Sequence, residues 1–179
     1  MFSLLLIVIA LALVVAIVLI IAASRPATFR VERSATIQAP PETVYALIED
    51  FHRWIAWSPW EGRDPALRRD FSGTGHGKGA VYAWEGNKQV GSGRMEIVEA
   101  AAPSKLVIKL DFLKPFEAHN TAEFTITPQG GGSTVHWAMH GPSPLMFRVM
   151  QMVMSMDKMV GKDFETGLAN LRKAAEQPR

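Results

Sequence analysis

Cysteine is absent from the 179 residues, which excludes disulfide bonds, thiolate metal ligands and cysteine nucleophiles. A long run of one charge is absent too, because 19 lysines and arginines are interspersed with 17 acidic residues, for a net charge of +2. The sequence has no basic stripe, zinc-ligand spacing or RNA-binding motif, so we expect no nucleic-acid partner. Its five histidines have no acidic residues at metal-ligand spacing, and we expect neither a metal nor a cofactor.

The first segment lacks charge altogether. Between Phe2 and Ala23 the only polar residue is Ser3. A helix of this length extends about 33 Å, enough to cross a hydrocarbon core of about 30 Å. We therefore expect residues 1–24 to be an uncleaved transmembrane anchor. A cleaved signal peptide is the alternative, although the apolar run is long for one and no basic residue precedes it.

Three arginines follow the apolar segment closely: Arg25, Arg30 and Arg33. Positive residues next to a span favour the cytoplasmic side of a membrane. We therefore expect a single-pass membrane protein whose remaining domain, residues 25–179, lies in the cytoplasm. Alternatively, these arginines belong to the surface of the first strand.

Alternating apolar and polar residues predict a strand from Thr28 to Gln38. The prolines of Ala39–Glu42 end this strand and suit the first turn of a helix. Apolar residues then recur at helical spacing through two short helices that end at Ser58-Pro59. Between Leu67 and Met139, alternation interrupted by glycine and proline turns predicts about six antiparallel strands.

The last part of the chain has no proline between Pro144 and Ala175. Apolar residues recur there every three or four positions, which predicts one continuous amphipathic helix. A curved antiparallel sheet of about six to seven strands has one face to bury, and this helix would cover it. The predicted fold class is therefore α+β. The apolar stripe of the helix consists of Met146, Val149, Val153, Met156, Val160, Phe164 and Leu171.

This order of elements resembles the START-like superfamily, also called SRPBCC and often labelled polyketide cyclase/dehydrase. The resemblance covers roughly residues 28 to 176 and rests on the segments "ATIQAPPETVYALIEDFHRWIAWSPW", "GKGAVYAWEGN", "LDFLKPFEAHNTAEFTITPQGGGSTVHWAM" and "MDKMVGKDFETGLANLRKAAE". It implies a helix-grip fold, in which a curved sheet wraps round a long C-terminal helix and leaves a cavity between them. The superfamily includes lipid carriers, hormone receptors, cyclases and co-chaperones, so the function must be argued from the site.

Three of the five tryptophans, Trp54, Trp57 and Trp60, fall within one short segment. Each indole can bury about 200 Å² of surface. These rings either seal the core or line the mouth of a cavity. We interpret them as a wall that core and pocket share.

Two polar residues fall on surfaces that we expect to face the cavity. Strand alternation places Asn120 on the inner face, and Asp157 lies about 40° from the centre of the helix stripe. Each is a candidate for a polar anchor or a catalytic group, and the alternative for Asp157 is that it points outward and pairs with a surface base. The residues predicted to bind a ligand are Trp54, Trp57, Trp60, Tyr82, Trp84, Met95, Leu110, Phe112, Asn120, Phe124, Trp137, Met150, Val153 and Asp157.

The sequence therefore predicts a membrane-anchored domain that binds a hydrophobic small molecule or lipid in an internal cavity. One alternative is an enzyme of cyclase, dehydratase or hydrolase type that uses Asp157 or Asn120 with water. Another is a non-catalytic membrane adaptor. Binding is favoured over catalysis because the sequence contains no evident acid–base pair. The expected partners are the hydrophobic ligand and the membrane, and protein partners stay open.

Overall fold

A computed structural model describes residues 2–177 of the chain. Met1 and residues 178–179, which the predicted anchor and domain include, lie outside the described residues. The elements in chain order are α1 (Phe2–Ser24), β1 (Thr28–Ile37), α2 (Pro41–Ile48), η1 (Phe51–Ala56), β2 (Arg68–Gly73), β3 (Ala80–Glu85), β4 (Ser92–Ala101), β5 (Lys105–Lys114), β6 (Ala118–Gln129), β7 (Gly132–Pro142), α3 (Leu145–Met150) and α4 (Met156–Glu176).

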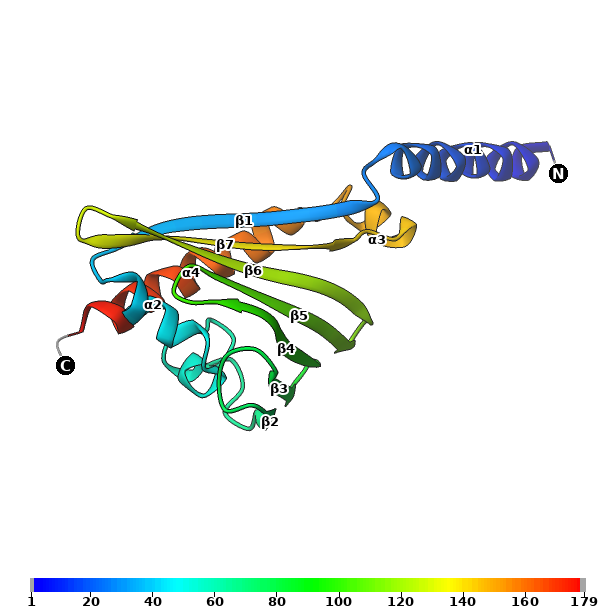
Figure 1. Cartoon of the computed structure of the whole chain (residues 1–179). Helices are drawn as coiled ribbons and strands as arrows, with labels where there is room; N and C mark the ends of the chain where they lie inside the picture. Colours follow the sequence, from blue (N-terminus) through cyan, green and yellow to red (C-terminus); the bar gives the residue numbers. More distant parts are fainter. Residues whose placement is uncertain (1, 178–179) are drawn as a thin grey trace.

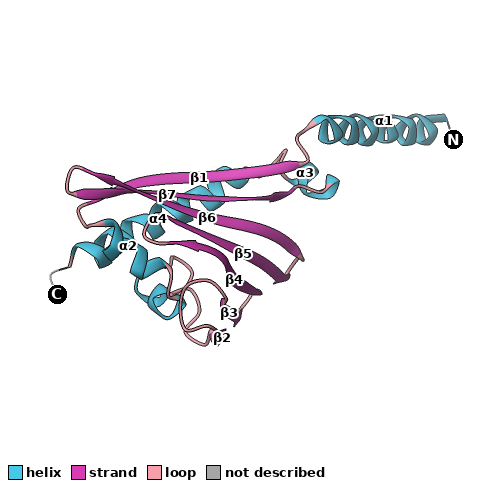
Figure 2. Ribbon diagram, viewed as in Figure 1, coloured by secondary structure: helices cyan, strands magenta, loops and turns pink. Residues whose placement is uncertain are grey.

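The strands form a single antiparallel sheet in the order β1-β7-β6-β5-β4-β3-β2. Figures 1 and 2 show the sheet curving, with α4 running along one side of it and α2 and η1 closing one end. The apolar segment α1 extends away from the sheet, beyond the start of β1 (Figure 1). The predicted α+β helix-grip fold is confirmed.

Strand alternation places the core on the face of the sheet that α4 covers. In β6, the buried residues Ala122, Phe124 and Ile126 alternate with more exposed polar residues. The same face receives Phe164 and Leu171 from α4, both almost fully buried. Period-two patterns in the sequence predicted these strands because one side of each is buried and the other faces water.

The predicted continuous helix from Pro144 is wrong, because α3 ends at Met150 and α4 begins only at Met156. The Ser155 hydroxyl accepts a hydrogen bond from the Lys158 amide at 3.3 Å and so caps the start of α4. Val153, in the segment between the helices, is 90% exposed. The cap at Ser155 therefore sets the start of the helix, although the apolar periodicity continues before it. The helix that packs on the sheet begins at Met156.

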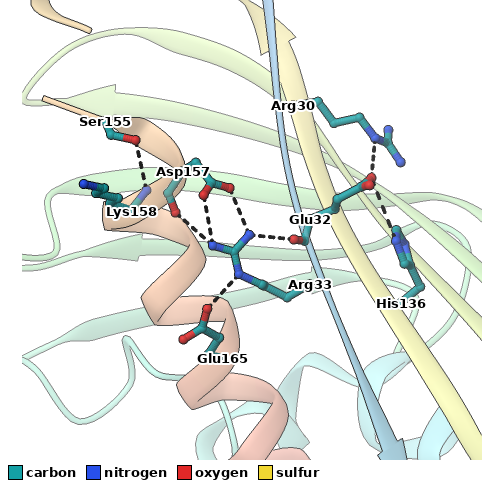
Figure 3. A network of polar contacts seen from close by, with 8 residues as sticks. All are labelled: Arg30, Glu32, Arg33, His136, Ser155, Asp157, Lys158 and Glu165. Carbon is teal, nitrogen blue, oxygen red and sulfur yellow. Dashed lines mark hydrogen bonds and ion pairs between the residues drawn. The ribbon is translucent and has the colours of Figure 1, made fainter. Parts of the chain in front are cut away.

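An arginine of β1 fastens the start of α4 to the sheet (Figure 3). The Arg33 guanidinium donates to both carboxylate oxygens of Asp157, at 2.9 and 3.1 Å, and to Glu165 at 2.7 Å. The hydrogen bond from Arg33 lowers the pKa of Asp157. Asp157 therefore points outward and pairs with a surface base, as the alternative interpretation held.

The absence of a side chain at Gly161 leaves room for this guanidinium, because a Cβ on Gly161 would lie 2.0 Å from Nη2 of Arg33. We expect Gly161→Ala to push the Arg33 guanidinium aside and break its exposed pairs with Asp157 and Glu165, so the loss of these pairs offsets most of the gain of about 1 kcal/mol in helix propensity. In an Arg33→Ala background the same change should instead stabilise by about 1 kcal/mol, because alanine is the better helix former. Urea unfolding of the four proteins measures this. An equal gain in stability in both backgrounds would contradict the close approach.

The Asp157–Arg33 pair also predicts a dependence of stability on pH. Because the folded pKa of Asp157 is lowered, the pair stabilises the fold above the unfolded pKa of about 3.9, and this contribution is lost as pH falls through the folded pKa. The effect should be small, since the Asp157 side chain is 59% exposed. Unfolding free energies between pH 5 and 2 should fall less steeply in Asp157→Asn than in the natural chain; parallel curves would contradict this role.

Candidate functional site

A cavity of about 280 Å³ lies between the sheet and the first half of α4. Ligand pockets usually measure about 300–1,000 Å³, so this one suits a small ligand or part of a longer one. Its wall is mainly apolar and aromatic. The predicted residues that the structure brings together on this wall are Trp54, Trp60, Tyr82, Trp84, Met95, Leu110, Phe112 and Trp137.

A polar corner interrupts the apolar wall where Glu61 meets Tyr82. The Tyr82 hydroxyl donates to Glu61 Oε1 at 2.7 Å, and Arg69 Nε donates to Glu61 Oε2 at 2.7 Å. Burial, together with the Glu61 carboxylate, raises the pKa of Tyr82, so the phenol stays neutral. The Glu61 side chain is only 7% exposed, and the charge of Arg69 balances its own. This corner is the part of the pocket that could orient a polar end of a ligand.

Sequence reasoning identified Tyr82 but missed Glu61. The only local signal was its position directly after Trp60, and both its partners lie further along the chain. A second carboxylate on the pocket wall, Asp163 of α4, was also missed. It pairs with Arg63, which comes from the segment between η1 and β2.

Trp137, which lines the pocket, is also the centre of an aromatic cluster. Its ring stacks on Phe164 with centroids 4.0 Å apart and on Phe124 at 4.9 Å. Trp57 and Trp60 meet it nearly at right angles, at 5.7 and 5.8 Å. Within residues 2–177, its Nε1 has no hydrogen-bond partner. The rigid wall of the pocket is therefore built from packed rings rather than from polar bonds.

A family model described as polyketide cyclase / dehydrase and lipid transport matches residues 28–176. The chain belongs to this family. The sequence-based resemblance is thereby confirmed, together with its extent. No curated protein matches the chain by sequence.

Solved structures share the fold of this family member at low sequence identity. Ginseng major latex-like protein 151 from Panax ginseng has a TM-score of 0.61 and 10% identity, with 85% of this chain and 100% of that one covered. The di-domain ARO/CYC BexL from the BE-7585A biosynthetic pathway has a TM-score of 0.61 and 14% identity, with 88% and 53% covered. The Aha1 dimer from Colwellia psychrerythraea has a TM-score of 0.57 and 15% identity, with 83% and 96% covered. At such identities these likenesses show the fold alone.

Two predicted aromatic residues of this family member lie in the core rather than on the pocket wall. Trp57 is 1% exposed, and its Nε1 donates to the carbonyl oxygen of Leu47 at 3.0 Å. Phe124 is fully buried and meets Trp57 edge to face. The segment with three tryptophans therefore divides, since Trp54 and Trp60 line the pocket and Trp57 fills the core behind it.

The polar candidates Asn120 and Asp157 are not among the residues that line the pocket. Asn120 is buried on the inner face, but its amide occupies the space beside Gly141, where a Cβ would lie 2.2 Å from Oδ1. Asp157 turns outward to Arg33. Neither position gives a side chain that a ligand in this pocket would meet.

Met150 and Val153 also lie away from the pocket, with exposures of 42% and 90%. They were placed on the cavity because the apolar stripe was continued back through residues 144–155. The break before α4 removes that part of the stripe from the sheet. On the helix, the pocket is lined instead by Val160, Asp163 and Phe164.

Proposed function

We propose that this protein binds a hydrophobic small molecule or lipid in the apolar pocket while α1 anchors it in a membrane. The observation that carries the binding proposal is the preformed cavity, walled by tryptophans and aliphatic side chains, with a single buried carboxylate–phenol pair at one corner. Such a site suits a ligand that is apolar over most of its surface and has one polar end.

The exposed surface of α1 supports the anchor. Residues Leu4–Ser24 form a helix whose most apolar window has a mean hydropathy of 3.8, and none of that window is buried inside the protein, although Ala22 near the end of the helix is. Water would solvate such a surface poorly, whereas lipid would cover it. Arg30 pairs with Glu32 and Arg33 pairs with Asp157, so Arg25 is the arginine that carries the proposed cytoplasmic orientation.

Mass spectrometry of the full-length chain purified in detergent tests both parts of the proposal. Under denaturing conditions we expect the mass of the whole chain, 19.7 kDa, because a retained anchor is not cleaved. Under native conditions we expect an additional mass that corresponds to one bound lipid or small apolar molecule. A chain that begins after residue 24 would contradict the anchor, and a native mass without any adduct would contradict the ligand.

Catalysis is the second candidate, and its support shifts from Asp157 and Asn120 to Glu61. Glu61 is a pocket carboxylate in contact with a phenol, which is the kind of pair that acid–base chemistry uses. Both of its oxygens are engaged by Tyr82 and Arg69, however, so binding remains the better-supported function.

A further inference from the structure

The domain exposes large apolar side chains mainly at one end. Outside α1, the most exposed are Val153 at 90%, Met146 at 76% and Phe116 at 75%. A soluble domain rarely gathers such residues without a partner that covers them. We define the end patch as Phe116, Met146, Met150, Val153, Met154 and Met159.

Strand register places this end of the sheet beside α1. Thr28, which starts β1, lies opposite Pro142, which ends β7. Phe112 near the end of β5 lies opposite Ala118 at the start of β6, so the turn that carries Phe116 belongs to the same end. Figure 1 shows α1 leaving the domain past this end, with α3 beside the junction.

Hydrogen bonds fix α3 at the level of the last turn of α1. Arg148 Nη1 donates to the carbonyl oxygens of Ala23 at 3.2 Å and Arg25 at 3.1 Å. Arg25 Nη1 in turn donates to the carbonyl oxygen of Gln151 at 3.4 Å. A span that ends at Ser24 therefore leaves the hydrocarbon where α3 and the methionines around it begin.

The pocket reaches the same end of the sheet. Its wall includes Gly91, which precedes β4, Lys114, which ends β5, and Pro115, which follows β5. Val160, in the second turn of α4, completes that side. An apolar ligand that entered between these loops and α4 would come from the surface that carries the end patch.

From this arrangement we propose that the end patch lies in the interfacial zone of the bilayer that α1 spans, so that the pocket fills from the membrane rather than from water. This inference rests on the proposed anchoring function of α1. Arg25, Lys88 and Lys158 are exposed at the same end and would meet lipid headgroups. Apolar side chains flanked by basic residues are typical of surfaces that lie about 5–10 Å deep at the boundary between headgroups and acyl chains.

Single-cysteine probes test this placement cleanly, because the natural chain has no cysteine. The full chain would carry Val153→Cys or Phe116→Cys, labelled with nitrobenzoxadiazole and reconstituted into phosphatidylcholine–phosphatidylglycerol vesicles that contain nitroxide lipids. Gln129→Cys, at the exposed end of β6 and at the opposite end of the sheet, is the matched control. Leu11→Cys reports on the span itself. We expect quenching at positions 153 and 116 to be about threefold stronger than at 129, since their depth should be about 5–10 Å.

Each outcome decides between the two proposals. Strong quenching at 11 with equal, weak quenching at 153, 116 and 129 would leave the anchor standing and overturn the membrane-facing end. Weak quenching at 11 would refute the anchor, and this inference with it. A blue-shifted label at 153 or 116 that nitroxide lipids do not quench would indicate that a second copy covers the patch, which also overturns the inference.

Discussion

Replacing Ala122 with phenylalanine is expected to lower the ratio of ligand-bound to ligand-free chain by at least about tenfold, an effect of about 1.4 kcal/mol on binding. Ala122 lies in β6 between Ile108 of β5 and Met139 of β7, and it lines the cavity of about 280 Å³. The added ring would occupy space that the ligand needs. Because that space is open, the ring should cost the fold little.

Ala83→Phe is the matched control for this experiment, since Ala83 belongs to β3 but alternates with the pocket residues Tyr82 and Trp84 and faces the other side of the sheet. Native mass spectra of the three proteins, purified from the same membranes, measure the bound fraction. Thermal unfolding checks that all three fold. If Ala122→Phe and the natural chain carried the same fraction of bound ligand, the proposal that the ligand binds in this cavity would be wrong.

Trp57→Ala is expected to destabilise the protein by about 3–5 kcal/mol, as truncating a buried aromatic residue usually does. Trp57 is 1% exposed, packs against Trp54, Phe124 and Trp137, and holds α2 through its bond to Leu47. Its loss would leave a void among rings that cannot close around it.

Trp60→Ala provides the contrast, because Trp60 is only partly buried and lines the pocket. We expect a smaller loss of stability, about 1 kcal/mol, together with a lower bound fraction of ligand. Urea unfolding and native mass spectrometry of both variants separate the two roles. Should Trp60→Ala prove as destabilising as Trp57→Ala, the distinction between pocket wall and core would be lost.

Local patterns in the sequence were sufficient to predict most of the fold. Alternation from Thr28 onward predicted β1, which the structure places at Thr28–Ile37, because burial of one strand face imposes that period. Alternation also placed Leu110 and Phe112 on the inner face, where both line the pocket. The family resemblance then supplied the way in which sheet and helix combine.

Contacts between distant residues could not be predicted in this way. Nothing near Asp157 in the chain indicates that Arg33 binds it, and nothing near Tyr82 points to Glu61. The break before α4 was missed for a related reason. Apolar spacing alone continues through Val153, whereas the cap at Ser155 and the attachment of α3 to α1 through Arg148 decide where the helix starts.

The connection between α1 and β1 has a consequence for transport. Only Arg25, Pro26 and Ala27 separate the two elements, a stretch that extends at most roughly 10 Å. On the proposed anchor, the domain could not travel to a second membrane in the manner of a freely diffusing carrier. The protein could take up or release a ligand only at the leaflet beside which the domain lies. Transfer of that ligand to another membrane would require a second protein.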